Sequence, residues 1–182
     1  MGHPTTKSEI LGALGSNAET IAAFISDMPE NALFTGNPER WGPAHHLVHL
    51  TMTSHAIQRG LCSLELPPHP TGRSRGYAEL IGAASAAVGA APRDLLLERG
   101  RVVTVPPTAN REALLSDYLL ASAQLRAAAE SLSEEDLDRR AMPHPYIGVL
   151  TLREMLLFCV FHERHHLKLA RGHAGRVPGS SS

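Results

Sequence analysis

The sequence has few aromatic residues and almost no net charge. Phe, Trp and Tyr make up 4% of the 182 residues, and the formal net charge at pH 7 is −1. A low aromatic fraction disfavours sheets, whereas the abundant Ala and Leu favour helices. No basic stripe with interleaved aromatic residues is present, so we expect no nucleic-acid partner.

Cysteine is also scarce. The two cysteines, Cys62 and Cys159, are too few for a disulfide scaffold and fall inside helical patterns. We therefore expect both to be buried small hydrophobic residues in a reducing compartment. Cys159 lies about one turn before His162, which makes it a weaker candidate for a metal ligand than the better-spaced histidines nearby.

Long apolar runs are absent too. No stretch reaches the roughly 18 apolar residues of a membrane-spanning helix. The first residues show no charged segment followed by an apolar one, which is the pattern of a secretory signal. We therefore expect a cytoplasmic protein that does not act at a membrane.

The chain does contain four long amphipathic helical patterns and no alternating strand pattern, which predicts an all-α fold, a four-helix bundle. We expect one domain over residues 1–174, a long connection between the second and third helices, and a flexible tail over residues 175–182. The four patterns begin near Lys7, Pro43, Asn110 (or Thr108) and Thr151, and end near Asp27, Leu64, Ala129 and Gly172. Weaker patterns predict helices over Tyr77–Val88 and Arg93–Arg99 and a helical turn at Ser133–Asp136, and residues 141–149 are expected to form a loop.

The fourth helical pattern contains two histidines one turn apart. His162 and His166 share a stripe with Met155, Cys159 and Leu169, while His165 points away from it. Buried imidazoles need partners, and a divalent metal satisfies two rings at once. The alternative is a pair of ordinary core histidines with hydrogen-bonded neighbours.

A second group of histidines opens the second helical pattern. Either His46 or His49 can face the bundle interior, and helical phase alone does not choose between them. His45 and His55 are expected to be surface or groove residues. A catalytic zinc-type site uses three protein ligands and keeps one position open, and bundles build such sites from facing helices. Two histidines from the fourth helix and one from the second would meet that count.

Several of these segments resemble the DinB/YfiT-like superfamily of metalloenzymes. They are Trp41 followed by His49-Leu50, the run Pro145-Tyr146-Ile147-Gly148-Val149-Leu150-Thr151-Leu152-Arg153-Glu154, and His162-Glu163-Arg164-His165-His166. The resemblance implies a four-helix bundle that binds a divalent cation, often nickel or zinc, through His49, His162 and His166. It thereby selects His49 over His46. His45, His46 and His165 are outside the ligand set, and we expect each of them either in solvent or behind a ligand.

The resemblance also narrows the chemistry, because characterised members include thiol-dependent S-transferases and a mycothiol-dependent isomerase. We expect a metal-dependent enzyme that activates a low-molecular-weight thiol, or water, toward a small-molecule electrophile, and the family's habit implies a homodimer. A metal-dependent hydrolase and a non-catalytic bundle that binds a metal or a small ligand are the alternatives. No catalytic residue is assigned. Glu163 is expected at the surface, His144 and Tyr146 in a loop over the bundle end, and Thr53 or Asp117 as partners that orient the ligating rings.

Overall fold

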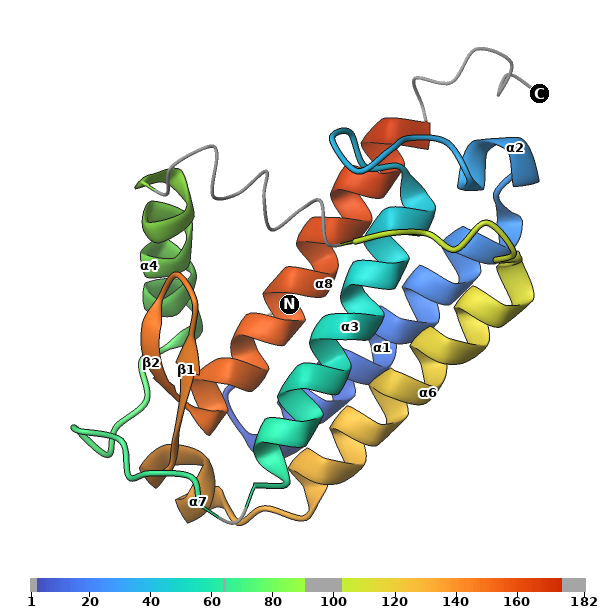
Figure 1. The fold of residues 1–182 in the computed structure, drawn as a ribbon. Coiled ribbons are helices and arrows are strands. Elements are labelled where there is room, and N and C mark those ends of the chain that lie inside the picture. Colours follow the sequence, from blue (N-terminus) through green and yellow to red (C-terminus); the bar gives the residue numbers. More distant parts are fainter. Residues whose placement is uncertain (1–2, 64, 91–102, 175–182) are drawn as a thin grey trace.

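Four long helices form the body of the protein in a computed structural model that describes residues 3–63, 65–90 and 103–174 (Figure 1). These helices are α1 (Lys7–Asp27), α3 (Pro43–Leu61), α6 (Arg111–Glu130) and α8 (Leu152–Ala174). Three shorter helices, α2 (Glu30–Leu33), α4 (Tyr77–Ala90) and α7 (Glu134–Arg139), and one hairpin of β1 (Ala141–His144) and β2 (Gly148–Thr151) complete the described part. The predicted all-α bundle is confirmed, and α4 lies in the long connection between α3 and α6. The predicted helix at Arg93–Arg99 and the tail at residues 175–182 lie outside the described residues.

Helices α1 and α6 begin where the sequence supplies side-chain acceptors for unpaired backbone N–H groups. Thr6 and Glu9 form a capping box at the start of α1, and Asn110 Oδ1 accepts a hydrogen bond from Ala113 N, 2.8 Å away, at the start of α6. Pro43 occupies the first turn of α3, where its missing N–H is not needed. These local signals explain why the predicted starts agree with the structure. At the other end, α3 stops at Leu61, about one turn before the predicted end near Leu64.

The two halves of the bundle have separate apolar clusters. One contains Ile10, Leu14, Leu125 and Leu156 and lies next to the hairpin and α4. The other contains Ile21, Ile25, Leu47, Leu50 and Tyr118 from α1, α3 and α6. Each such side chain contributes roughly 1.5–3 kcal/mol when it is fully buried. The histidines of α3 and α8 lie at the end of the bundle that the second cluster stabilises, and α8 packs beside α3 there (Figure 1).

The segment before α8 is a β-hairpin, so the predicted loop over residues 141–149 is wrong. The strands pair antiparallel, with Ala141 opposite Thr151 and His144 opposite Gly148. His144 Nδ1 accepts hydrogen bonds from the backbone N–H groups of Tyr146 and Ile147, at 3.2 and 3.3 Å, which closes the turn. Gly148 follows with φ of 86°, a value that favours glycine. The turn depends on a side chain that binds its own backbone, which a pattern of apolar residues does not reveal.

The start of α8 has the predicted capping box. Thr151 N donates to Glu154 Oε2 and Glu154 N donates to Thr151 Oγ1, both at 3.1 Å. Arg75 also donates to Glu154 through its Nε at 2.7 Å and its backbone N at 2.8 Å. Burial alone would raise the pKa of Glu154, but the hydrogen bonds from Arg75 and Thr151 outweigh it and hold the pKa below its usual range. The predicted end at Gly172 is wrong, because α8 continues to Ala174.

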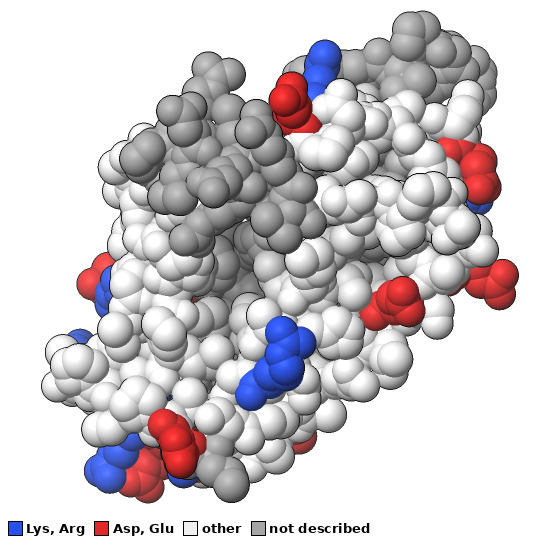
Figure 2. All heavy atoms as spheres, in the orientation of Figure 1, with Lys and Arg blue, Asp and Glu red and all other residues white. Residues whose placement is uncertain are grey.

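The surface carries scattered charges of both signs. On the face seen in Figure 2, Lys and Arg side chains are interspersed with Asp and Glu, and no broad positive patch is visible. None of the helices in the described ranges has both the length and the apolar character needed to cross a membrane. Cys62 is exposed at the end of α3, so its predicted burial is wrong, whereas Cys159 is buried as predicted.

Candidate metal centre

The packing of α3 against α8 brings together three histidines that are far apart in the sequence. His49 Nε2 lies 3.1 Å from His162 Nε2, and His162 Nε2 lies 3.0 Å from His166 Nε2. One ring nitrogen from each of the three residues lies within 4.8 Å of the others. The residues that the sequence nominated as a ligand set therefore converge on one point.

Two of the three nitrogen–nitrogen distances are close to what a small divalent cation requires, and the third is within 4.8 Å. In a tetrahedral site with metal–nitrogen bonds of about 2.0–2.1 Å, neighbouring nitrogen atoms lie roughly 3.3 Å apart. The distances of 3.0 and 3.1 Å are within a few tenths of an ångström of that value. Imidazole ligands suit zinc and nickel among the common divalent metals. The residues present therefore fit such a cation.

The electrostatics of the site keep the three rings neutral near pH 7. Burial lowers the pKa of His49 to about 4. Burial, together with the nearby rings of His49, His165 and His144, lowers that of His162 to about 3. Burial and neighbouring histidine rings also place the pKa of His166 well below its ordinary value. A neutral imidazole has a free lone pair, which is the form that binds a metal, so no proton has to be displaced at neutral pH.

Two aromatic side chains enclose the group. Trp41, which precedes α3, has its ring centroid 5.0 Å from that of His49 and 6.0 Å from that of His166. Phe158 stacks on His162 from one turn earlier in α8, at 5.3 Å and 25°. His144 of the hairpin meets Phe158 edge-on at 4.5 Å. The hairpin therefore supports the wall of the site through Phe158.

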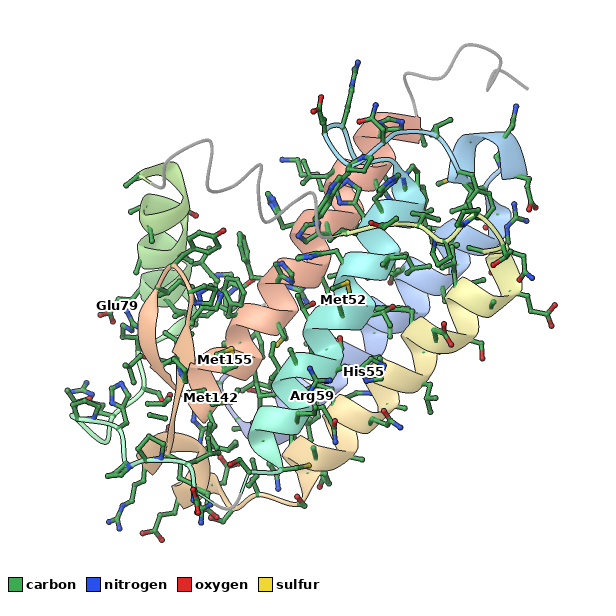
Figure 3. All side chains as sticks on the ribbon, in the orientation of Figure 1. Met52, His55, Arg59, Glu79, Met142 and Met155 are labelled. Atoms are coloured by element: carbon green, nitrogen blue, oxygen red, sulfur yellow. The ribbon has the colours of Figure 1, made fainter. Side chains whose placement is uncertain are left out.

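Four other histidines of α3 and α8 lie near the group but are not part of it. His46, the alternative to His49, lies outside the three-residue group, and its Nδ1 is 2.9 Å from Nδ1 of His166. His45 was expected to be polar and exposed but is only 6% exposed, because α3 is covered on that side as well. His165 is exposed, as predicted, and stacks on Phe161. His55 is half-buried on α3, one turn before Arg59 (Figure 3), and is not part of the group.

Glu163 is buried, so its predicted surface position is wrong. Its side chain is 3% exposed, Oε2 accepts a hydrogen bond from Asn17 Nδ2 at 3.0 Å, and Oε1 accepts one from Tyr118 OH at 3.4 Å. Burial raises its pKa to about 7, although the hydrogen bonds from Asn17 and Tyr118 oppose the shift. These partners belong to α1 and α6, so Glu163 connects α8 to its neighbour α1 and, across the bundle, to α6.

Several other expectations about the site also need correction. Leu169 is 44% exposed and does not continue the buried stripe of α8. Thr53 does not orient a ligand ring, because its hydroxyl donates to the backbone carbonyls of His49 and Leu50 at 3.0 and 3.1 Å. Asp117 is exposed on α6. The side chain that does contact a ligand ring is His46, one of the histidines that were expected either in solvent or behind a ligand.

A comparison with known protein families found one that matches the chain. The family model of the DinB superfamily matches residues 13–170, a range that includes all three converging histidines, the two aromatic walls and the capping box of α8. No curated protein matches the chain. The match covers most of the sequence, and the helical bundle is the fold that it implies. The chain therefore belongs to the DinB superfamily.

Proposed function

We propose that this protein is a metal-dependent enzyme that transfers a low-molecular-weight thiol to a small-molecule electrophile. In this proposal His49, His162 and His166 hold a divalent cation, nickel or zinc. The observation that carries the proposal is the convergence of three neutral ring nitrogens from α3 and α8 in a member of the DinB superfamily. A cation held there would supply Lewis-acid activation of a thiol or of water at neutral pH.

The chain's own residues prepare the site for a substrate from solution. Three protein donors leave one coordination position for an incoming group. Trp41 and Phe158 pack against the rings of the donors, which holds the ring planes in place and limits the access of water. The buried rings accept no proton at neutral pH, so all three donors remain available together.

The cysteines of the chain do not supply the nucleophile, which supports a thiol from solution. Burial raises the pKa of Cys159, so its thiol stays protonated at neutral pH, and it is not among the converging donors. Cys62 lies at the other end of α3 from His49, a separation of roughly 20 Å at 1.5 Å per residue. A thiol that reacts at the histidine group therefore has to diffuse in.

The experiment uses untagged protein, because a histidine tag would itself bind the metal. The protein is stripped with a chelator, reloaded with nickel or zinc, and analysed for bound metal. Thiol consumption against a panel of activated aryl halides and epoxides is then measured beside the hydrolysis of activated esters, for loaded and stripped protein. We expect thiol conjugation that requires the metal.

Each other outcome contradicts the proposal in a distinct way. Ester hydrolysis without thiol consumption would identify a metal-dependent hydrolase. Metal binding without any product would identify a binding protein. If the reloaded protein held no stoichiometric metal, the three histidines would be ordinary core residues and not ligands. The stripped protein serves as the matched control, because it differs from the loaded protein only in the cation.

A further inference from the structure

A hydrogen bond joins His166 to a histidine outside the ligand set. His46 Nδ1 lies 2.9 Å from His166 Nδ1, and the two residues are 7% and 9% exposed. In a neutral imidazole one ring nitrogen carries the proton and the other accepts. One of these two Nδ1 atoms must therefore donate and the other accept, and the choice determines where both protons lie.

The position of His166 determines the direction of this hydrogen bond. Its Nε2 faces the group, 3.0 Å from His162 Nε2, so Nε2 must present a lone pair if it is to bind a cation. The proton of the neutral ring then lies on Nδ1, which donates to His46 Nδ1. His46 consequently accepts at Nδ1 and carries its own proton on Nε2.

On the side away from the other histidines, the two rings face an apolar cleft. Ile21 and Phe24 of α1, Leu50 of α3 and other apolar side chains line the narrow cleft in which the rings meet. Trp41 packs edge-on against His46 at 5.5 Å and 74°. Within the described part of the chain, His166 is the one ligand of the three whose Nδ1 has a side-chain partner, and that partner is His46.

We propose that His46 is a positioning residue that holds His166 in the tautomer and ring orientation in which Nε2 can bind the cation. The inference rests on the proposed ligand set and deepens it, because it names a fourth histidine that acts through a ligand rather than on the substrate. A partner of this kind typically changes metal affinity by 10–100-fold when it is removed.

Three substitutions test the proposal by metal affinity rather than by activity. His46→Leu removes the acceptor and keeps an apolar side chain in an apolar cleft. His46→Asn places an amide oxygen on the same side-chain carbon that bears Nδ1 in histidine, so it restores an acceptor. His45→Leu is the matched control, because His45 is the equally buried neighbour and has no hydrogen bond to a ligand. Zinc dissociation constants are measured by competition with a chromophoric chelator, and circular dichroism checks the fold of each metal-free variant.

We expect His46→Leu to weaken zinc binding by about 10–100-fold, and His46→Asn and His45→Leu to remain near the wild-type value. Equal affinity of His46→Leu and wild type would overturn the proposal. So would a loss in His46→Asn or His45→Leu as large as that in His46→Leu, because burial or packing would then explain the effect.

A second measurement uses the wild-type protein and does not depend on the folding of a variant. Long-range proton–nitrogen NMR of the zinc-loaded protein reports which nitrogen of each ring carries a proton. We expect His166 to be protonated at Nδ1 and His46 at Nε2, and the reverse assignment for His46 overturns the proposal. Zinc binding with these tautomers but without turnover would refute the enzymatic function and leave the positioning role intact, whereas a wild-type protein that binds no zinc refutes both.

Discussion

Replacing Glu163 by glutamine should make the protein more stable at alkaline pH. Glu163 is 3% exposed and accepts hydrogen bonds from Asn17 and Tyr118. The amide of Glu163→Gln has nearly the same shape. Its oxygen can accept from Asn17 Nδ2, and its nitrogen can donate to the hydroxyl oxygen of Tyr118, so the packing and both hydrogen bonds are kept. What changes is the charge.

The size and sign of the effect follow from the pKa of the carboxyl group. Burial raises the pKa of Glu163 from 4.5 to about 7 in the folded protein. The folded state holds this proton more tightly than the unfolded state does. The contribution of the Glu163 carboxyl group to stability is therefore fully present below pH 4.5, and it is lost as the pH rises from there through 7. At 1.36 kcal/mol per pKa unit, the loss above pH 8 is about 3 kcal/mol. The uncharged amide of the variant does not incur this loss.

The assay is urea unfolding of the chelator-treated wild type and variant at pH 5, 6, 7 and 8, compared at each pH. The difference in unfolding free energy should be below about 1 kcal/mol at pH 5 and grow to about 3 kcal/mol at pH 8. Other titrating groups cancel in this difference, because both proteins contain them. Glu19→Gln, at an exposed position of α1, is the control and should parallel the wild type. Parallel curves for Glu163→Gln as well would show that the buried carboxyl is not destabilised by its charge.

Three further predictions concern the metal, the fold and the assembly. In calorimetry, His162→Ala should weaken zinc binding at least about 100-fold, which is more than the loss of an outer partner costs. The variant His165→Ala, at an exposed position, should bind zinc as the wild type does. Equal affinities of the two variants would exclude His162 as a ligand. Thr151→Val removes the hydroxyl that accepts from Glu154 N and also hydrogen-bonds Ser74 Oγ, so it should cost about 1–2 kcal/mol in thermal unfolding. An unchanged midpoint would show that neither contact stabilises the start of α8. Light scattering after size-exclusion chromatography should give twice the chain mass, because we propose a homodimer, and a single-chain mass would contradict this.

The sequence predicted those parts of the fold that local chemistry determines. The starts of α6 and α8 depend on Asn110 and on the pair Thr151 and Glu154, and such signals lie within a few residues of the helix end. The helical period likewise placed His162 and His166 on one face. The choice of His49 over His46 came from the family resemblance and not from the residues' phase, since both lie near the same side of α3.

The errors about burial share a physical cause, which is that contacts from distant segments decide which side chains are covered. A single apolar stripe was expected on α8, yet α1, α3, α4 and the hairpin together cover more than one face. Glu163 is buried because α1 packs on α8, and Asn17 of α1, 146 residues earlier, donates to it. Leu169 is exposed near the C-terminal end of α8, where fewer elements cover the helix. The pairing of His46 with His166 spans 120 residues and was equally invisible to a local pattern.

The junction between the hairpin and α8 makes chain length, and not only side-chain identity, a requirement for the metal centre. β2 ends at Thr151 and α8 begins at Leu152, so no linker absorbs a change of register. Adding or deleting one residue between Glu154 and His162 would turn the imidazoles by about 100° relative to the capped end. The rings would then face α1 or the solvent instead of α3. An insertion there should abolish metal binding even if every histidine were kept.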